Sequence, residues 1–362
     1  MHRYLKVTSA GVRHYAIALL ALMALSLSPA RAVDPPACPD TLDAMALALV
    51  SNAPVTLADD DASHGDYVMP SMGDVDALAA AFATGLGGDI GTMETQAATL
   101  GLDHCLLSLA TPNGNEDIDV WYPPDGFDAM TTRGLPLLAL RRTIGTRPVI
   151  LGVPHAATEY RIAAQGVAVF TGQPAVTMLV IAPQHRCHLA DIAPAAFQGS
   201  TDQCDGVYRE SDAAHTQQSL FHALHRGAWS AWPTAITLQI HGMSAAGISA
   251  SPGKKGNVAP ASDWPATALH DRYAAGLEAL GFDPATLTTC VDYTGPRGDR
   301  VREHLCGTKN AQRGGLADLT RERDFIHLEQ SRNVREEPGG DDALATAAGF
   351  AASAIWRDSF EQ

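Results

Sequence analysis

The stretch Val149–Tyr160, VILGVPHAATEY, decides the fold. Its first five residues form an apolar run that ends at a proline, the pattern of a strand buried on both faces of a sheet. His155 and Glu159 follow this run, four positions apart. The sequence therefore places an imidazole and a carboxylate just past the carboxyl end of a buried strand. They form a functional site only if other segments of the chain supply further side chains at the same place.

Three later segments repeat the pattern of an apolar run that ends in polar, chemically active residues. They are AVTMLVIAPQHRCHLAD (175–191), TAITLQIHGM (234–243) and RDFIHLEQSRNVR (323–335), and helical patterns lie between them at 211–229 and 261–280. Strands alternating with helices predict an α/β fold with a mainly parallel central sheet flanked by helices on both faces. In such a sheet the ligand site lies outside the carboxyl ends of the strands.

Residues 1–32 have the pattern of a signal peptide. Arg3, Lys6 and Arg13 precede the apolar run AIALLALMALSL, and SPARA follows it, which predicts cleavage near Ala32. The run is too short for a membrane span. No cysteine stands at the cleavage point, which disfavours a lipoprotein. We expect a soluble periplasmic or secreted protein that has no membrane partner after the signal is removed.

Residues 33–132 form a region of unknown role, and residues 133–362 form the α/β region that carries the chemistry. The first region alternates Ala-rich helical stretches such as DVDALAAAFATGL (74–86) with the acidic loops LADDDASHGDY (57–67) and TPNGNEDIDVWYPPDG (111–126). Calcium is an alternative for these loops, but neither has the EF-hand spacing, so we predict solvated loops. The segment ASPGKKGNVAP (250–260) predicts a mobile loop or lid.

Charge and cysteine content limit the possible partners. Without the four basic residues of the signal peptide, 21 basic residues stand against 40 acidic residues, a net charge of −19. Such a chain repels nucleic acid. Six cysteines in an exported protein indicate three disulfides, and sequence order favours Cys38–Cys105, Cys187–Cys204 and Cys290–Cys306, although fifteen pairings exist for six cysteines.

The strand ends offer a set of metal ligands. His155 and Glu159 follow one strand, His241 ends another, and Glu329 lies in a third. Two imidazoles and one carboxylate leave a fourth position of tetrahedral zinc open for water, as catalytic zinc sites do. Taken singly, each has an ordinary structural role as an alternative: a strand-end histidine, a first-turn carboxylate near a helix dipole, and an outward-facing glutamate.

PHAATE, LQIHGM and FIHLEQSRNVR, in this order after strands, resemble the zinc-carboxypeptidase-like hydrolases, which include the N-formylglutamate amidohydrolase branch. The resemblance covers residues 133–335. It implies an α/β fold with a mixed central sheet and a Zn²⁺ cofactor. It also implies His155, Glu159 and His241 as metal ligands and Glu329 as the general base. Three residues separate His155 from Glu159, where peptidases of this family usually have two, so Glu159 is the least secure ligand.

Arginines in such sites bind a substrate carboxylate or polarise the scissile carbonyl. Arg186, at the end of a strand and beside Cys187, is the expected catalytic and substrate-binding arginine. Arg313, with Asn310 close by in TKNAQRGG, is expected to bind substrate as well. Surface ion pairing is the alternative for both arginines. The histidines His185, His188 and His215 are expected to contact the metal ligands from outside, with ordinary polar neighbours as the alternative.

The sequence thus predicts an exported zinc-dependent hydrolase that cleaves an amide bond in a peptide, a wall-derived peptide or an N-acyl amino acid. No HExxH, GxSxG or Walker A motif is present. One alternative is an exported binding protein on a hydrolase-like fold without turnover, which has no need of an unligated base. Another is a metal-free hydrolase with a Ser or Asp nucleophile in the same crevice.

Overall fold

The computed structural model describes residues 35–51, 67–111, 114–124, 133–187, 204, 208–257 and 263–353. Residues Pro36–Gln362 form one compact unit. The predicted signal peptide, residues 1–32, lies outside the described residues, and so does the acidic segment 57–66.

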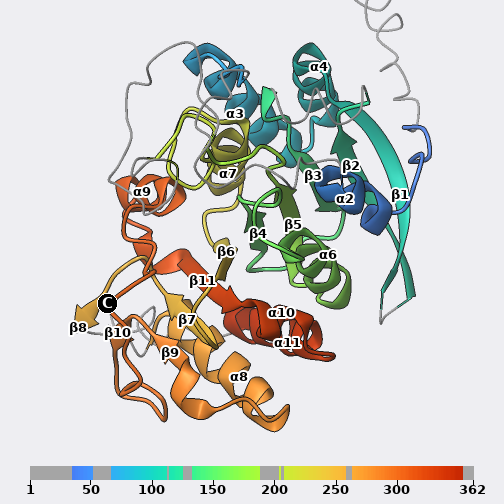
Figure 1. Ribbon diagram of the computed structural model, residues 1–362. Coiled ribbons are helices and arrows are strands. Elements are labelled where there is room, and N and C mark those ends of the chain that lie inside the picture. Colours follow the sequence, from blue (N-terminus) through green and yellow to red (C-terminus); the bar gives the residue numbers. More distant parts are fainter. Residues whose placement is uncertain are drawn as a thin grey trace, which may run out of the picture. The chain divides into compact units, whose positions relative to one another are not determined.

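Four parallel strands form the centre of a nine-stranded sheet (Figure 1). They are β5 (Val176–Ile181), β4 (Val149–Val153), β6 (Ile236–Met243) and β11 (Phe325–Ser331), in this order across the sheet. Every residue of β4, β5 and β11 is buried, as expected for a parallel sheet covered on both faces. These are the four strands that the sequence predicts.

Antiparallel strands extend this parallel centre on both sides. β3 (Leu137–Arg141), β2 (Gly114–Tyr122) and β1 (Asp103–Thr111) follow β5, each antiparallel to its neighbour. On the other side, β7 (Ile248–Ser251) runs antiparallel to β11 and pairs in parallel with β9 (Leu287–Thr289). The predicted fold class, α/β with a mixed, mainly parallel central sheet flanked by helices, is confirmed.

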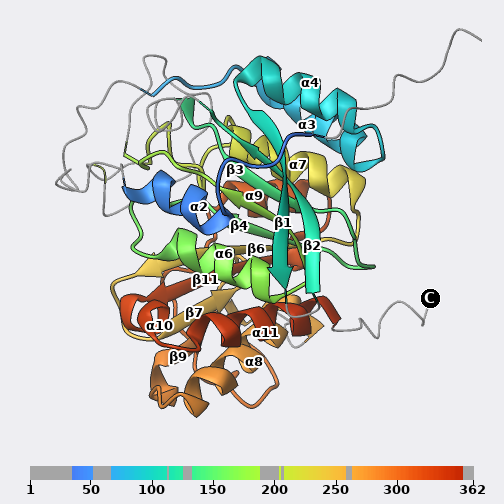
Figure 2. The same ribbon diagram turned by 90° about the vertical axis from the view of Figure 1, so that its right-hand side faces the viewer.

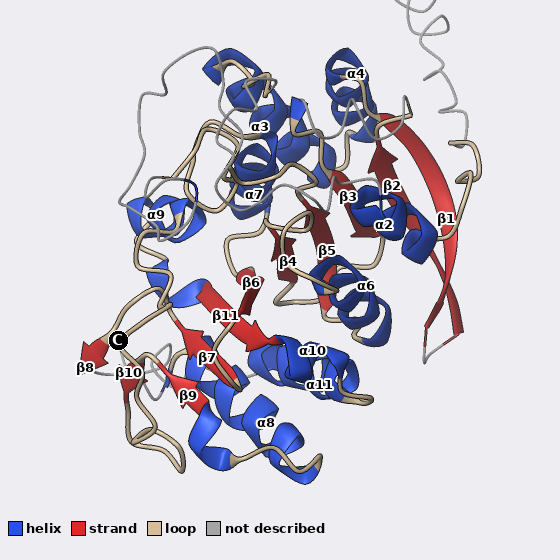
Figure 3. Cartoon of the chain, in the orientation of Figure 1, coloured by secondary structure: helices blue, strands red, loops and turns tan. Residues whose placement is uncertain are grey.

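Helices cover both faces of the sheet and enclose two apolar cores (Figures 2 and 3). One core is formed with α2 (Leu42–Ser51), α6 (Ile162–Gly172), α8 (Pro265–Ala279) and α11 (Gly340–Ser353). The other core is formed with α3 (Met72–Leu86), α4 (Ile90–Leu100), α7 (Leu220–Ala231) and α9 (Ala311–Asp318). Shorter elements are α10 (Arg332–Glu336), η3 (Pro284–Thr286), η4 (Glu322–Asp324) and the paired strands β8 (Gly256–Asn257) and β10 (Val291–Asp292). None of the described helices combines the length and hydropathy needed to span a membrane.

The prediction of a loop at 111–126 is wrong, because Gly114–Tyr122 is strand β2. Ile118 and Val120 are buried in one core and Trp121 in the other. Acidic residues conceal the strand in the sequence. Asp119, between Ile118 and Val120, is buried in the strand, where it contacts His104 and Arg142. The strands β1 and β2 join the region 33–132 to the same sheet as the later strands.

Two further predictions need correction. The segment 250–260 is only partly loop: Ser251 belongs to β7, Gly256 and Asn257 form β8, and residues 258–260 lie outside the described residues. The helical pattern at 211–229 begins only at Leu220, after the N-cap Ser219. Asp212 accepts a hydrogen bond from the backbone NH of Ala214, a local turn that competes with helix formation.

The three disulfides have the predicted pairing, Cys38–Cys105, Cys187–Cys204 and Cys290–Cys306. They fit a protein that folds in an oxidising compartment outside the cytoplasm.

Candidate metal centre

Polar side chains gather where the parallel strands β4, β6 and β11 end. His155 lies two residues past the end of β4, His241 lies in the last part of β6, and Glu329 lies on β11 directly opposite His241 in the parallel register. All three side chains are buried. The chain thus brings together, from three distant segments, residues that the sequence predicts for one site.

A single tight turn brings Glu159 back to His155. The backbone NH groups of Thr158 and Glu159 both donate to the carbonyl of His155. Residues four apart in such a turn lie on the same side, and Glu159 Oε1 is 2.8 Å from His155 Nδ1. Three intervening residues therefore bring the two side chains together. Arg161, with φ of 60°, then begins the next helix, α6.

His155 is held between two carboxylates. Its Nδ1 faces Glu159, and its Nε2 lies 3.0 Å from Asp212 Oδ1. Asp212 Oδ1 is also 3.0 Å from His215 Nδ1. An outer carboxylate on a ligand histidine fixes the tautomer and turns the other ring nitrogen toward the metal. Asp212 gives His155 this arrangement, with Nδ1 as the inner nitrogen.

His241 has a matching arrangement. Its Nδ1 lies 3.7 Å from Glu159 Oε1, and its Nε2 lies 3.4 Å from Gln239 Oε1. Gln239 is itself fixed, because its Oε1 accepts from Asn310 and its Nε2 donates to Gln312. Both histidines thus turn Nδ1 toward Glu159 and bond through Nε2 to an outer acceptor.

The residues present fit a metal ion. One ligand atom from each of His155, Glu159 and His241 lies within 4.8 Å of the others, and all three side chains are buried. The remaining oxygen of Glu159, Oε2, accepts a hydrogen bond from the backbone NH of Gly242, which fixes the carboxylate. Two nitrogens and one oxygen match the ligand types of a zinc site with an open position.

The charges of His155, Glu159, His241 and the neighbouring Asp212, called the cluster below, depend on one another. Burial favours neutral His155, but Asp212 and Glu159 outweigh burial and raise the pKa of His155 to about 9. Burial alone would raise the pKa of Glu159, but His155 and His241 hold it well below its usual value. Burial lowers the pKa of His241 despite the neighbouring Glu159. The two neighbouring carboxylates thus favour the protonated form of His155.

Glu329 lies beside this group without a firm partner. Its Oε1 is 3.7 Å from His327 Nε2, and its buried Oε2 has no hydrogen-bond partner among the described residues. Burial, and then the neighbouring Glu159, hold the pKa of Glu329 well above its usual value. Glu329 is thus a buried carboxyl group that the ligand group of His155, Glu159 and His241 does not include.

Arginines flank the cluster on two sides. Arg186 Nη1 is 3.7 Å from Glu159 Oε1, and the Cys187–Cys204 disulfide follows it directly. Arg335, which the sequence reasoning missed, donates to the carbonyl of Tyr160 and is so close to Gly242 that a Cβ there would lie 2.7 Å from its guanidinium. Glycine at position 242 therefore allows this buried arginine to reach the cluster.

The structure does not group Asn310 and Arg313 directly with His155, Glu159 and His241, and their predicted substrate contacts stay a prediction. Asn310 is buried and caps α9, and its side-chain amide donates to Gln239, so it supports His241 indirectly. Arg313 packs beside Gly253 and Phe325. Phe325 begins β11, whereas Glu329 lies toward the carboxyl end of that strand, so the structure does not bring Arg313 to the cluster.

Of the three histidines expected to contact the metal ligands, His215 does so through Asp212, which also bonds to His155. His185 Nδ1 instead accepts from the backbone NH of Cys187, and His188 lies outside the described residues. The sequence reasoning missed Asp212 and His327. His327 carries a recognisable signal, since it precedes Glu329 by two residues and so points to the same side of the strand. Asp212 carries only a weak one, the DxxH spacing to His215.

No family model, curated protein or solved structure matches this chain. Membership of the zinc-carboxypeptidase-like hydrolases therefore stays a prediction from the resemblance of three short segments. What the described residues establish is an α/β protein with a buried group of histidine and carboxylate side chains at the carboxyl ends of its parallel strands, compatible with a metal ion.

Proposed function

We propose that this protein is an exported zinc-dependent hydrolase that cleaves an amide bond. The observation that carries the proposal is the buried group of His155, Glu159 and His241, whose ligand atoms lie within 4.8 Å of one another beside the unligated carboxylate of Glu329. Its position outside the carboxyl ends of parallel strands is where α/β sheets bind ligands.

His155 Nδ1, Glu159 and His241 Nδ1 would hold the metal ion. Imidazole and carboxylate donors suit zinc, and three protein ligands leave a position for substrate or water. When bound, zinc acts as a Lewis acid toward a water molecule and toward the scissile carbonyl. Asp212 and Gln239 keep the outer nitrogens of the two histidines occupied, so that Nδ1 of each ring stays directed inward.

Glu329 takes a proton from the attacking water and transfers it to the departing nitrogen. Arg186 donates hydrogen bonds to the oxyanion that forms on the carbonyl, a role worth about 3 kcal/mol in comparable sites. Its side chain retains 20% exposure, which leaves it accessible to a substrate. The resemblance to carboxypeptidases and N-formylglutamate amidohydrolases supports a peptide, a wall-derived peptide or an N-acyl amino acid as substrate.

The signal-peptide pattern of residues 1–32 supports a periplasmic or secreted location. The three disulfides agree with that location, because structural disulfides form and persist in oxidising compartments.

Metal content tests the proposal most directly. Purified wild-type protein should retain at least one zinc ion per chain after dialysis, and His155→Ala and His241→Ala should retain none under the same conditions. His304→Ala removes an exposed histidine and should bind zinc like the wild type. Wild-type protein that takes up no zinc when offered it would contradict the proposal and leave the metal-free hydrolase as the alternative.

Glu329→Gln separates a hydrolase from a binding protein that has no turnover. The variant keeps the size of the side chain and the three metal ligands, so zinc content should not change. Loss of the base should lower kcat by about 10²- to 10⁴-fold on a panel of N-acyl amino acids and short peptides. A wild-type protein that binds zinc and these compounds but turns none of them over would favour the binding protein.

A further inference from the structure

A second group of metal-ligand side chains lies beside the first. It consists of His241, His327 and Glu329, all buried, with one ligand atom from each within 4.8 Å of the others. This group and the group of His155, Glu159 and His241 have only His241 in common. A third such group among the described residues, His155, Asp212 and His215, lies on the outer side of His155, where Asp212 Oδ1 is already 3.0 Å from a nitrogen of each ring.

Strand geometry fixes the second group firmly. His327 and Glu329 lie two residues apart on β11 and so point to the same side of the sheet. Glu329 pairs in register with His241 on β6, and the rings of His241 and His327 have centroids 4.5 Å apart. His327 Nε2 and Glu329 Oε1 are 3.7 Å apart. Ligand atoms carried by two adjacent central strands keep this spacing without help from loops.

Both residues of β11 have a buried polar atom that lacks a partner. Glu329 Oε2 and His327 Nδ1 have no hydrogen-bond partner among the described residues, and the two side chains are 10% and 6% exposed. A buried polar atom without a partner is costly, and the cost is greatest for a charged group. A cation held by the pair would compensate the carboxylate.

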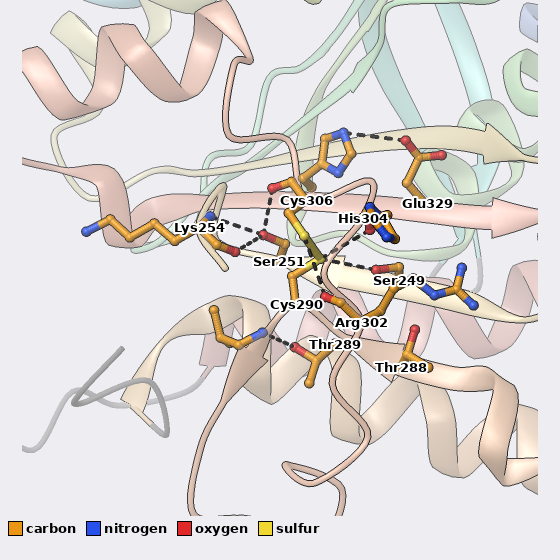
Figure 4. Close-up of a disulfide and its surroundings, with 12 residues drawn as sticks. Ser249, Ser251, Lys254, Thr288, Thr289, Cys290, Arg302, His304, Cys306 and Glu329 are labelled. Carbon is orange, nitrogen blue, oxygen red and sulfur yellow. Dashed lines mark hydrogen bonds and ion pairs between the residues drawn. A yellow bond between two sulfur atoms is a disulfide. The ribbon is translucent and has the colours of Figure 1, made fainter. Parts of the chain in front are cut away.

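Packing holds the imidazole of His327 in place. Gly307, with φ of 62°, lies so close that a Cβ there would be 2.6 Å from the ring. The neighbouring Cys306 is fixed by its disulfide to Cys290, and the hydroxyl of Ser251 donates to its carbonyl. In Figure 4, Ser251 bonds to the carbonyl of Cys306, and Glu329 lies on the neighbouring strand. The loop that carries Gly307 thus forms a fixed wall of the second group.

We propose that His327 and Glu329, next to the shared His241, bind a second divalent cation beside the zinc ion of the proposed function. While this cation is bound, Glu329 is a ligand and cannot take a proton, so the general-base role of the proposed function belongs to the protein with one ion. Zinc and similar ions suit an imidazole and a carboxylate, and cations in paired sites lie about 3.5–4 Å apart. This inference rests on the proposed function for its first ion. Since Gln239 occupies Nε2 of His241, the shared ring offers one nitrogen, and the second cation has fewer protein ligands than the first.

The second ion should therefore bind at least 10-fold more weakly than the first and leave during dialysis. The test is a calorimetric zinc titration of metal-stripped protein, with elemental analysis of protein equilibrated in excess zinc. Wild type should take up two equivalents and His327→Gln one. Ser249→Ala changes the residue opposite Glu329 on β7 and provides no ligand of either group, so it should take up two. Thermal unfolding of each metal-stripped variant shows whether it is folded.

The outcomes separate this inference from the proposed function. One equivalent in wild type that is lost in His155→Ala would overturn the second cation and leave the proposed function standing. Two equivalents in a folded His327→Gln would also overturn it. Uptake of no zinc by wild type would overturn both. Two equivalents in wild type with one in His327→Gln and two in Ser249→Ala would establish the second site.

Discussion

At the scale of single residues, the geometry of the candidate centre depends on residues outside the group of His155, Glu159 and His241. Asp212 and Gln239 each bond to the outer nitrogen of a histidine, and Gly242 gives its backbone NH to Glu159. None of these three residues is predicted from the sequence as part of the site. Their hydrogen bonds nevertheless orient the side chains of His155, Glu159 and His241.

Asp212→Asn tests this support. The amide retains the size of the side chain but loses the charge that orients His155, so zinc affinity should fall by about 10- to 100-fold. Competition with a chromophoric chelator measures the affinity, and His304→Ala is the control at an exposed position. Unchanged affinity in Asp212→Asn would mean that packing alone holds the ring of His155.

At the scale of elements, close backbone approaches and buried polar contacts hold together helices and strands from separate stretches of the sequence. Helix α7 approaches α3 so closely at Gly227 that a Cβ would lie 2.7 Å from the carbonyl of Ala79 and 2.9 Å from Phe82. Strand β2 carries the buried Asp119, which contacts His104 on β1 and Arg142 just after β3. Each contact depends on one residue.

Gly227→Ala should destabilise the protein, because the α3 backbone must move away from α7. The expected loss is about 1–3 kcal/mol, despite the roughly 1 kcal/mol by which alanine favours a helix over glycine. Gly91→Ala is the matched control in α4, where the nearest atom to the added Cβ lies at 3.7 Å. Urea denaturation should show a lower midpoint only for Gly227→Ala; equal midpoints would disprove the close packing.

Asp119→Asn should change the acid side of the stability curve. Burial alone would raise the pKa of Asp119, but His104 and Arg142 hold it below the usual 3.8. The charged carboxylate therefore stabilises the folded state above about pH 4, and this contribution is lost as the pH falls through the lowered pKa.

We expect Asp119→Asn to be less stable than wild type by about 3 kcal/mol at pH 7, with a smaller difference at pH 3. Urea midpoints at pH 7, 5 and 3 measure this, with the exposed Asp117→Asn as control. A difference that stays constant with pH would assign the effect to shape and not to charge.

At the scale of the whole molecule, one nine-stranded sheet joins strands that lie between Asp103 and Ser331 in the sequence. Cys38–Cys105 ties the amino-terminal segment to the edge strand β1 and closes a sequence separation of 67 residues, against 17 for Cys187–Cys204. Cross-links over longer separations restrict the unfolded chain more strongly.

Replacing both cysteines of Cys38–Cys105 with serine should cost about 4 kcal/mol of stability, and replacing those of Cys187–Cys204 about 3 kcal/mol, by the entropy of loop closure. Calorimetric unfolding compares the two double variants. Only the Cys187–Cys204 variant should also raise KM, since that disulfide follows Arg186. The reverse order of stabilities would show that native packing outweighs chain entropy.

The parallel centre of the fold could be predicted because β4 and β5 are almost entirely apolar and β6 and β11 carry apolar residues before polar ones. The histidines His155 and His241 could be placed near each other because each lies at or just past the carboxyl end of one of these strands.

The strands β1 and β2 could not be predicted, because the acidic residues of β2 resemble those of a solvated loop. Only the folded structure shows that Asp119 contacts His104 and Arg142. Asp212 lies 57 residues from His155 in an irregular segment, and no periodic pattern relates the two.

β11 is the last strand to be synthesised, yet it lies between β6 and β7, which precede it in the chain. A chain still emerging from the ribosome therefore has an interrupted sheet and lacks both His327 and Glu329. Any chemistry that needs Glu329 begins only after translation has passed this strand and the strand has inserted. The order of synthesis therefore sets the order in which the side chains of the candidate centre come together, with those of β11 last among the described strands.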